Sequence, residues 1–434
     1  MTEDRVARGR RSPGCRRLRY FLILSIALIA AISAAPAIGS SGGAGTGGKG
    51  GKPAGPGSTD KSTRSGSPFA TRAMWIWELG SSNGGSVSSI LATARQYKIQ
   101  TLFIKAGDGS SVWSQFNAQT VAALRARGLQ VCAWQYVYGV NPLTEARVGA
   151  QAVSNGADCL LIDAESEYEG RYVQAQTYVT ELRKLIGPNF PVALAGFPYI
   201  DFHPAFPYSV FLGPGGAQYN VPQMYWKDIG TTVDNVFAHT YAFNRIYGRP
   251  ISPLGQVYNS PPARQVVRFR QISRAYGALG VSWWDWQESP RSNWIALSRP
   301  AGSPAHFAVS PTVATLGKGA AGDIVVWAQE HLVSAGFPVT IDGGYGRATV
   351  TAVEAFQTAH GLIPDGIVGP ATWQALLRFA PAAVVWMTKH GKRSATIAGL
   401  HGKRLLRIPK SASMHAKRDE IPGSLGSGRP PGRH

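Results

Sequence analysis

The sequence predicts an α/β fold, in which a (β/α)8 TIM barrel is followed by a small all-α domain of three helices. Between residues 73 and 298, short apolar runs alternate with amphipathic helical stretches, the pattern of parallel strands connected by helices. Farther along, a turn that begins Asp-Gly occurs at Asp342 and again at Asp365, and a helix start follows each time. The chain of 434 residues is long enough for both units.

The apolar runs have the length and composition of buried strands, and most are followed by a helix. The runs are Met74–Trp77, Thr101–Ile104, Leu129–Trp134, Cys159–Ile162, Val192–Ala195, Val221–Tyr225, Ile251–Gly255 and Gly280–Trp284. The expected helices include Val87–Tyr97, Ala118–Arg127, Glu145–Ser154, Tyr172–Ile186, Val233–Tyr247 and Ala263–Tyr276. Four prolines, from Pro198 to Pro214, replace a clean helix in the fifth unit. An open doubly wound sheet is the alternative arrangement.

The rest of the chain divides by composition. Residues 1–39 join an Arg-rich start to an uncharged apolar run from Tyr20 to Ile38, which predicts a cleaved export signal or a retained N-terminal anchor. Residues 40–70 are rich in Gly, Ser and Pro and predict a flexible linker. We expect the barrel in residues 71–298, a second linker in 299–315, the helical domain in 316–378 and a basic disordered tail in 388–434.

The net charge of +20 lies mostly near the ends of the chain. Residues 1–19 contribute +5, residues 40–72 contribute +4 and residues 388–434 contribute +9, which leaves +2 for the remainder. This distribution argues against nucleic-acid binding by a folded surface. It favours contact of the basic ends with anionic envelope polymers or a lipid surface, and solubilising tails are the alternative.

The chain contains three cysteines, Cys15, Cys132 and Cys159. So small a number implies no disulfide framework. Cys132 and Cys159 fall on consecutive predicted strands and could approach each other, but we expect two buried thiols.

The repeated turns form part of a longer pattern. Asp342-Gly343-Gly344-Tyr345-Gly346-Arg347-Ala348-Thr349 is followed by Asp365-Gly366-Ile367-Val368-Gly369-Pro370-Ala371-Thr372, with Leu316-Gly317, Gln329, Leu332, Ala352-Val353, Phe356-Gln357 and Gly361-Leu362 at fixed places around them. This pattern resembles the peptidoglycan-binding domain of the repeat type, and it covers about 60 residues. The resemblance implies that the protein is located at the cell wall and that its partner is peptidoglycan or a related wall glycan.

In a parallel barrel, functional groups lie at the carboxyl ends of the strands. The sharpest pair there is Asp163 and Glu165, because two carboxylates at i and i+2 on an extended strand project to the same side and raise each other's proton affinity. One can then stay protonated as an acid while the other is ionised. Further polar or aromatic candidates near strand ends are Glu78, Asp108, Gln135, Gln223, Tyr225, Trp226, Trp284 and Asp285.

The segment from Asp158 to Glu165 resembles the fourth strand of glycoside hydrolase barrels, both the family 18 chitinase type and the family 25 lysozymes. The resemblance implies that Glu165 is the general acid, that Asp163 tunes it or stabilises positive charge, and that Tyr225 and Asp285 position the substrate. It also implies substrate-binding roles for Gln223, Trp226 and Trp284. Glu78, Asp108 and Gln135 are further substrate-binding candidates because they lie just past predicted strands.

The sequence therefore predicts an exported cell-wall glycosidase that needs no cofactor or metal. The alternative is a non-catalytic wall-binding protein with a degenerate hydrolase barrel. A zinc amidase or a cysteine peptidase fits less well. His203 and His239 lack zinc-ligand spacing, and Cys159 lies within a strand rather than at an exposed helix start.

Overall fold

The computed structural model describes residues 66–389 and 392–397. The expected export signal or anchor, the linker up to residue 65 and the tail beyond residue 397 lie outside the described residues. Within the described ranges, no helix combines the length and the apolar character needed to cross a bilayer.

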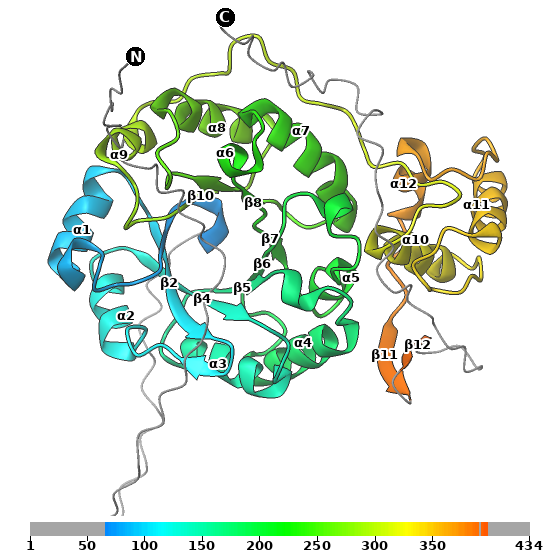
Figure 1. Ribbon diagram of the computed structural model, residues 1–434, viewed down its shortest axis with the longest axis horizontal. Helices are drawn as coiled ribbons and strands as arrows, with labels where there is room; N and C mark the ends of the chain where they lie inside the picture. Colours follow the sequence, from blue (N-terminus) through cyan, green and yellow to red (C-terminus); the bar gives the residue numbers. More distant parts are fainter. Residues whose placement is uncertain (1–65, 390–391, 398–434) are drawn as a thin grey trace, which may run out of the picture. The chain divides into compact units, whose positions relative to one another are not determined.

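Parallel strands form a closed ring in residues 72–284 (Figure 1). The strands are β1 (Arg72–Ile76), β2 (Thr101–Asp108), β4 (Gln130–Val137), β5 (Leu160–Ala164), β6 (Val192–Ala195), β7 (Tyr219–Asn220), β8 (Gln223–Met224), β9 (Leu254–Gln256) and β10 (Val281–Trp284), and the short β3 (Ser111–Val112) pairs antiparallel with β2. Since β7 pairs with β6 and β8 pairs with β9, these two short strands together fill one position. With β10 paired to β1, eight positions close the barrel, as predicted, and the open sheet is excluded.

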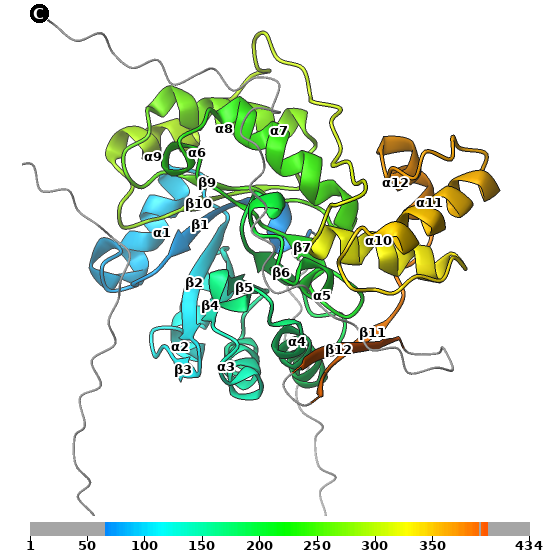
Figure 2. The same cartoon turned by 45° about the vertical axis from the view of Figure 1, so that its right-hand side comes forward.

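Helices form the outer ring (Figures 1 and 2). They are α1 (Val87–Gln96), α2 (Ala118–Arg125), α3 (Pro142–Ser154), α4 (Tyr172–Ile186), α5 (Tyr208–Phe211), α6 (Trp226–Ile229), α7 (Val233–Asn244), α8 (Ala263–Ala275) and α9 (Arg291–Ser298). Side chains of Ser86, Asn117 and Thr232 cap the N-termini of α1, α2 and α7. The fifth unit is irregular, as predicted, because only a short 3-10 helix and the four residues of α5 follow β6.

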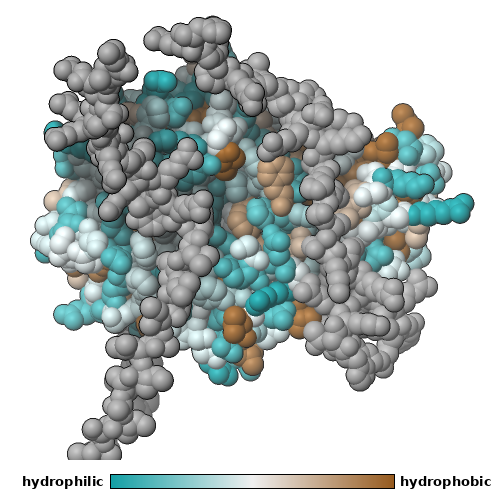
Figure 3. Space-filling model, viewed as in Figure 1, coloured by the Kyte–Doolittle hydropathy of each residue, from teal (hydrophilic) through white to brown (hydrophobic). Residues whose placement is uncertain are grey.

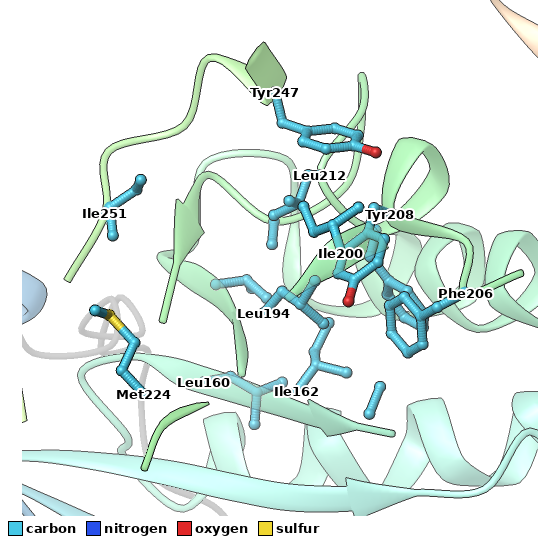
Figure 4. Close-up of a cluster of buried hydrophobic side chains, with 14 of the residues drawn as sticks. Leu160, Ile162, Leu194, Ile200, Phe206, Tyr208, Leu212, Met224, Tyr247 and Ile251 are labelled. Carbon is cyan, nitrogen blue, oxygen red and sulfur yellow. The ribbon is translucent and has the colours of Figure 1, made fainter. Parts of the chain in front are cut away.

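Alternation along each strand separates an inner from an outer core. On β5, Leu161 points into the ring, whereas Leu160 and Ile162 pack against the helices. Figure 4 shows part of the outer core, where these two residues meet Leu194 of β6 and side chains such as Tyr208 from the segment that follows it. This alternation also decides which side chains at the strand ends face the mouth of the barrel.

The inner core contains a disulfide between Cys132 of β4 and Cys159, the residue before β5. The expectation of two thiols was wrong. The parallel register places Ala133 opposite Leu160, so the two cysteines are side by side with Cα atoms 4.6 Å apart, and both are fully buried. The sequence alone does not give this register.

The helical domain consists of α10 (Asp323–Ser334), α11 (Arg347–Ala359) and α12 (Pro370–Leu376). The predicted repeat is confirmed in its hydrogen bonds. The buried amide of Gln329 donates to Asp342 Oδ1 (3.0 Å), Gly344 O (3.1 Å) and Thr349 Oγ1 (3.1 Å).

Gln357 repeats the arrangement in the second half of the domain. Its amide donates to Asp365 Oδ1 (2.8 Å), Ile367 O (2.9 Å) and Thr372 Oγ1 (3.0 Å). In each half, a glutamine on one helix fixes the turn that starts the next helix. These conspicuous residues therefore hold the domain together.

A buried carboxylate joins this domain to the barrel. Asp323, the first residue of α10, accepts hydrogen bonds from Ser209 N (2.8 Å), Ser209 Oγ (2.7 Å) and Tyr247 Oη (2.8 Å). Trp327 donates from its indole to Ile246 O at 2.8 Å. These are fully or almost fully buried contacts, so the domain is packed on the barrel.

An antiparallel hairpin of β11 (Val384–Lys389) and β12 (Lys392–Ile397) follows the helical domain. The expectation of disorder from residue 388 was therefore wrong for residues 388–389 and 392–397. The hairpin is held by α4, where the amide of Gln176 donates to Val384 O (2.7 Å) and accepts from Trp386 N (2.7 Å). Trp386 also packs on Tyr172, with ring centroids 4.4 Å apart. The missed signal is the apolar run that begins at Val384.

The visible surface is mainly hydrophilic or neutral, and its hydrophobic residues are scattered (Figure 3). Single apolar side chains such as Val140 and Ile363 are exposed at 67% and 80%. Scattered residues of this kind are ordinary for a folded surface and indicate no docking face by themselves.

Candidate active site at the carboxyl ends of the strands

Asp163 and Glu165 lie together at the carboxyl end of β5. Asp163 is on the strand and only 6% exposed, while Glu165 follows the strand and is partly buried. Gln223 of β8 joins them, because its amide nitrogen lies 2.9 Å from Asp163 Oδ1 and 3.1 Å from Glu165 Oε1. The predicted pair and Gln223 thus form one hydrogen-bonded group facing the mouth of the barrel.

Burial raises the pKa of both carboxyl groups. For Asp163, the neighbouring charge of Glu165 raises the pKa further and Lys105 opposes the rise. For Glu165, the hydrogen bond from Gln223 opposes the rise, and the charge of Glu167 adds to it. A buried pair of this kind retains a proton to higher pH than an isolated carboxyl group would, as a general acid requires.

Tyr225 follows β8 and lies among the site carboxylates. Burial raises its pKa well above the ordinary value, and the charges of Asp163, Glu165 and Asp285 contribute to the rise. Its phenol therefore stays protonated at neutral pH and can donate a hydrogen bond. Tyr258 packs against it edge to face, with ring centroids 5.5 Å apart.

Asp285 follows β10 and is 1% exposed. Burial raises its pKa to about 7, against the effect of backbone N–H groups at Gln287 and Glu288. With its amide oriented to satisfy both ends, Gln287 donates to Asp285 Oδ2 at 3.1 Å and accepts from Glu78 N at 2.7 Å. Asp285 is thus a further carboxyl group with a raised pKa at the same face of the barrel.

Lys105 is a buried cation at this face that sequence reasoning missed. It is 6% exposed, its ammonium group lies 2.5 Å from Asp108 Oδ2, and it lies 4.3 Å and 5.0 Å from the ring centroids of Trp113 and Trp134. Asp108 also accepts from Tyr138 Oη at 2.7 Å. The predicted Asp108 is therefore part of a paired cluster. The available signal was the spacing from Phe103, which faces the inner core. Lys105 lies two residues later on the same strand and therefore on the same face.

Glu167 is a third carboxylate next to the pair and was also missed. It accepts a hydrogen bond from Tyr136 Oη at 2.9 Å, and its charge raises the pKa of Glu165. Its position two residues after Glu165 continues the spacing of the pair. The site thus has a run of three alternate acids.

Other predicted residues are distributed differently. The Trp284 ring lies in the inner core, with its centroid 5.7 Å from Trp75 and 5.4 Å from Trp134. Gln135 is fully buried on the outer side, and its amide donates to Gly109 O and Glu145 O, both at 2.9 Å. Trp226 is also fully buried and donates to Gln265. Glu78 is exposed and accepts from Ser81 Oγ at 2.9 Å. The structure does not bring Gln135 or Trp226 to the mouth of the barrel.

Within the described part of the chain, no cluster of three or more His, Cys, Asp or Glu side chains has the arrangement of a metal site.

Residues 321–376 match the family described as a putative peptidoglycan binding domain. The matched segment includes α10, α11, α12 and both Asp-Gly turns. The helical domain therefore belongs to this family, as its repeat pattern predicted.

The curated proteins that are similar to this chain match it over segments about as long as the peptidoglycan-binding domain. The zinc D-Ala-D-Ala carboxypeptidase of Streptomyces albus G is 45% identical over 67 residues, which are 14% of this chain and 26% of that protein. The N-acetylmuramoyl-L-alanine amidase CwlL of Bacillus licheniformis is 47% identical over 64 residues, 14% of this chain and 18% of that protein. The chain thus spans about a quarter or less of the length of these relatives.

Among solved structures, a fungal endo-β-N-acetylglucosaminidase from glycosyl hydrolase family 18 is similar to part of this chain. The match covers 53% of this chain and 98% of the fungal chain. The identity is 11% and the TM-score 0.40.

Proposed function

We propose that the protein is a cell-wall glycosidase that hydrolyses peptidoglycan or a related N-acetylated wall glycan. The observation that carries the proposal is the pair of buried carboxyl groups, Asp163 and Glu165, joined by Gln223 at the carboxyl end of a parallel barrel. The membership of residues 321–376 in a peptidoglycan-binding family supports the choice of the wall as target.

In this proposal Glu165 protonates the glycosidic oxygen as the bond breaks. Its raised pKa keeps it in the acid form at a pH where an exposed glutamate would be ionised. Asp163, placed next to a buried lysine, stabilises positive charge that develops on the sugar or on a neighbouring group. The phenol of Tyr225 donates a hydrogen bond to the substrate and helps to fix the orientation of the substrate.

The second half of the reaction has two routes. If the N-acetyl group of the substrate attacks the anomeric carbon, no second protein carboxylate is needed across the bond. Otherwise Asp285 or Glu78 has to supply one, at roughly 5 Å from the acid for a retaining reaction.

The test compares glycan release from purified sacculi by the parent and by Glu165→Gln. We expect release to fall by about two orders of magnitude or more when the general acid is removed. Glu181→Gln is the matched control, since Glu181 lies on α4 and its contacts are with Arg147 and Lys184. Equal release by parent and Glu165→Gln would contradict the acid assignment, and no release by either would favour a non-catalytic wall-binding protein.

A further inference from the structure

Lys105 and Asp108 both lie on the inner face of β2, although they are three residues apart. In a regular strand, residues at this spacing face opposite sides of the sheet. The register between β2 and β4 shifts between Lys105 and Gly107, where β2 has one extra residue. Lys105 consequently lies opposite Trp134, which faces the inner core. Asp108 lies opposite Tyr136, which packs against the same core. The irregularity thus brings an ammonium group and a carboxylate together inside the barrel.

The register also connects this ion pair to Asp163. Tyr136 on β4 lies opposite Asp108 of β2 on one side and opposite Asp163 of β5 on the other. The three strands are neighbours in the ring (Figure 1), so the three residues form one row and face the same side of the sheet. Strands two positions apart are separated by about 10 Å. Charges interact over this distance where water is excluded.

The ion pair has a fixed orientation. Tyr138 Oη donates to one carboxylate oxygen of Asp108 at 2.7 Å, and Lys105 Nζ lies 2.5 Å from the other. The ammonium group also lies 5.0 Å from the ring centroid of Trp134. Because Lys105 is almost fully buried, water screens its charge little, and its ammonium group is not available to a substrate.

The charge of Lys105 favours the ionised form of Asp163. Burial and the charge of Glu165 raise the pKa of Asp163 most, and Lys105 lowers it. Asp108 and Glu167 raise this pKa, each by less than Lys105 lowers it. Toward Asp163, the ion pair of Lys105 and Asp108 therefore acts as a net positive charge.

The other polar groups that face Asp163 are neutral. Burial raises the pKa of Tyr136 and of Tyr225 above the ordinary value, so both phenols keep their protons at neutral pH. The amide of Gln223 donates to Asp163 and to Glu165 alike. These groups therefore add no positive charge that could replace that of Lys105.

The two carboxyl groups of the site compete for a proton. Asp163 is the more deeply buried of the two, and burial alone would favour the proton on Asp163. The proposed reaction requires the opposite arrangement. Glu165 has to hold the proton as the acid, and Asp163 has to be ionised to stabilise positive charge. A positive charge close to Asp163 favours this arrangement.

We propose that Lys105 is a positioning residue, which acts through Asp163 to shift the shared proton toward Glu165. The catalytic meaning of this role rests on the proposed function. The position of the proton can be measured without any substrate, so the two ideas can be tested separately.

The experiment is carbon-13 NMR of the full chain with labelled carboxyl groups, recorded across the pH range in which the pair titrates. Asp163→Asn and Glu165→Gln identify the two resonances, because each variant lacks one of them. In Lys105→Met, we expect the Asp163 resonance to move toward its protonated value and the Glu165 resonance toward its ionised value. The rate constant kcat on soluble wall oligomers should fall by about tenfold, with KM within about twofold of the parent. Lys184→Met, an exposed lysine on α4 beside Glu181, is the matched control and should leave both resonances unchanged.

Asp108→Asn is a second variant, which keeps the proposal testable if Lys105→Met does not fold. It removes the counter-charge of Lys105, while its amide oxygen can still accept the hydrogen bond from Tyr138. The two resonances should then move in the directions opposite to those in Lys105→Met. The pH profile of activity should shift to higher pH in Lys105→Met and to lower pH in Asp108→Asn, each by about one unit.

Unchanged resonances of Asp163 and Glu165 in the folded variants would overturn the proposal, and so would shifts in the same direction in Lys105→Met and Asp108→Asn. If the resonances move as expected but the parent releases no glycan from sacculi, the placement of the proton is supported and only the proposed function fails.

Discussion

Gln223 and Glu165 are hydrogen-bonded across the barrel mouth at 3.1 Å, and the same amide nitrogen lies 2.9 Å from Asp163. One neutral donor therefore serves two acids. It stabilises the ionised form of Glu165, whose pKa burial otherwise raises. The pKa of Glu165 thus depends on the neutral side chain of Gln223.

Replacing Gln223 should move the pH dependence of the reaction. In Gln223→Met the stabilising hydrogen bond is lost, so the pKa of Glu165 rises and the alkaline limb of the activity profile shifts to higher pH, by up to about one unit. The measurement is glycan release between pH 5 and 9. Gln119→Met, at an exposed position on α2, is the control. An unshifted alkaline limb in Gln223→Met would contradict the assignment of Glu165 as acid.

Stability should fall as the pH rises toward neutrality. The pKa of Asp285 is raised to about 7 in the folded chain, above the unfolded value of 3.8, so the folded state holds the proton more tightly. This contribution is complete below pH 4 and is lost as the pH rises through 7. The difference corresponds to about 4 kcal/mol at most.

Thermal unfolding between pH 4.5 and 8 tests this contribution. The parent should melt at a lower temperature at pH 8 than at pH 5, and Asp285→Asn should reduce the difference, because its amide does not titrate. Asp228→Asn, at an exposed position after β8, should keep the slope of the parent. Identical slopes for the parent and Asp285→Asn would show that Asp285 is not the titrating group.

The disulfide should contribute substantially to the stability of the barrel. Cys132 and Cys159 are 27 residues apart, and closing a loop of this length corresponds to about 3 to 4 kcal/mol in the chain-entropy account. We expect the double variant Cys132→Ala, Cys159→Ala to lose about this free energy of unfolding in urea. The parent in reductant should approach the variant once the thiols form, as alkylation and mass measurement can verify. A variant as stable as the oxidised parent would contradict the bond.

Wall binding should depend on the buried glutamines of the helical domain. In Gln357→Met the turn at Asp365 loses its donor and Gly366 N loses its acceptor, at a cost of about 2 to 3 kcal/mol. We expect weaker co-sedimentation with sacculi, and hydrolysis of soluble oligomers should be retained. Gln374→Met, at an exposed position on α12, is the control. Full sedimentation of Gln357→Met would show that this turn is dispensable.

The barrel was predictable because eight buried strands leave a strong apolar signal, whereas the direction of side chains near their ends was not. Trp134 faces inward and its neighbour Gln135 outward, and Tyr225 and Trp226 divide in the same way. A residue near a strand end reaches the mouth of the barrel only if its place in the alternation is right. That place depends on register and on short breaks such as the one between β7 and β8.

Charged residues inside apolar runs were also missed by the sequence-based prediction of the site. Lys105 belongs to a strand that reads as buried, so a pattern of apolar residues gives no reason to place a cation there. Its partners, Asp108 and two tryptophan rings, come from neighbouring positions in space. The pair of Asp163 and Glu165, in contrast, was evident because both acids lie on one strand end.

The hairpin of β11 and β12 changes how the two folded parts are connected. Since Gln176 and Tyr172 on α4 hold residues 384–386, the chain leaves the barrel after α9, forms the helical domain and returns to the barrel. The helical domain is thus attached to the barrel at two places, through the connector before it and through the hairpin after it. A protease that cut the connector between residues 299 and 315 would leave the helical domain held by Asp323 and by the hairpin, so one cleavage would not release it.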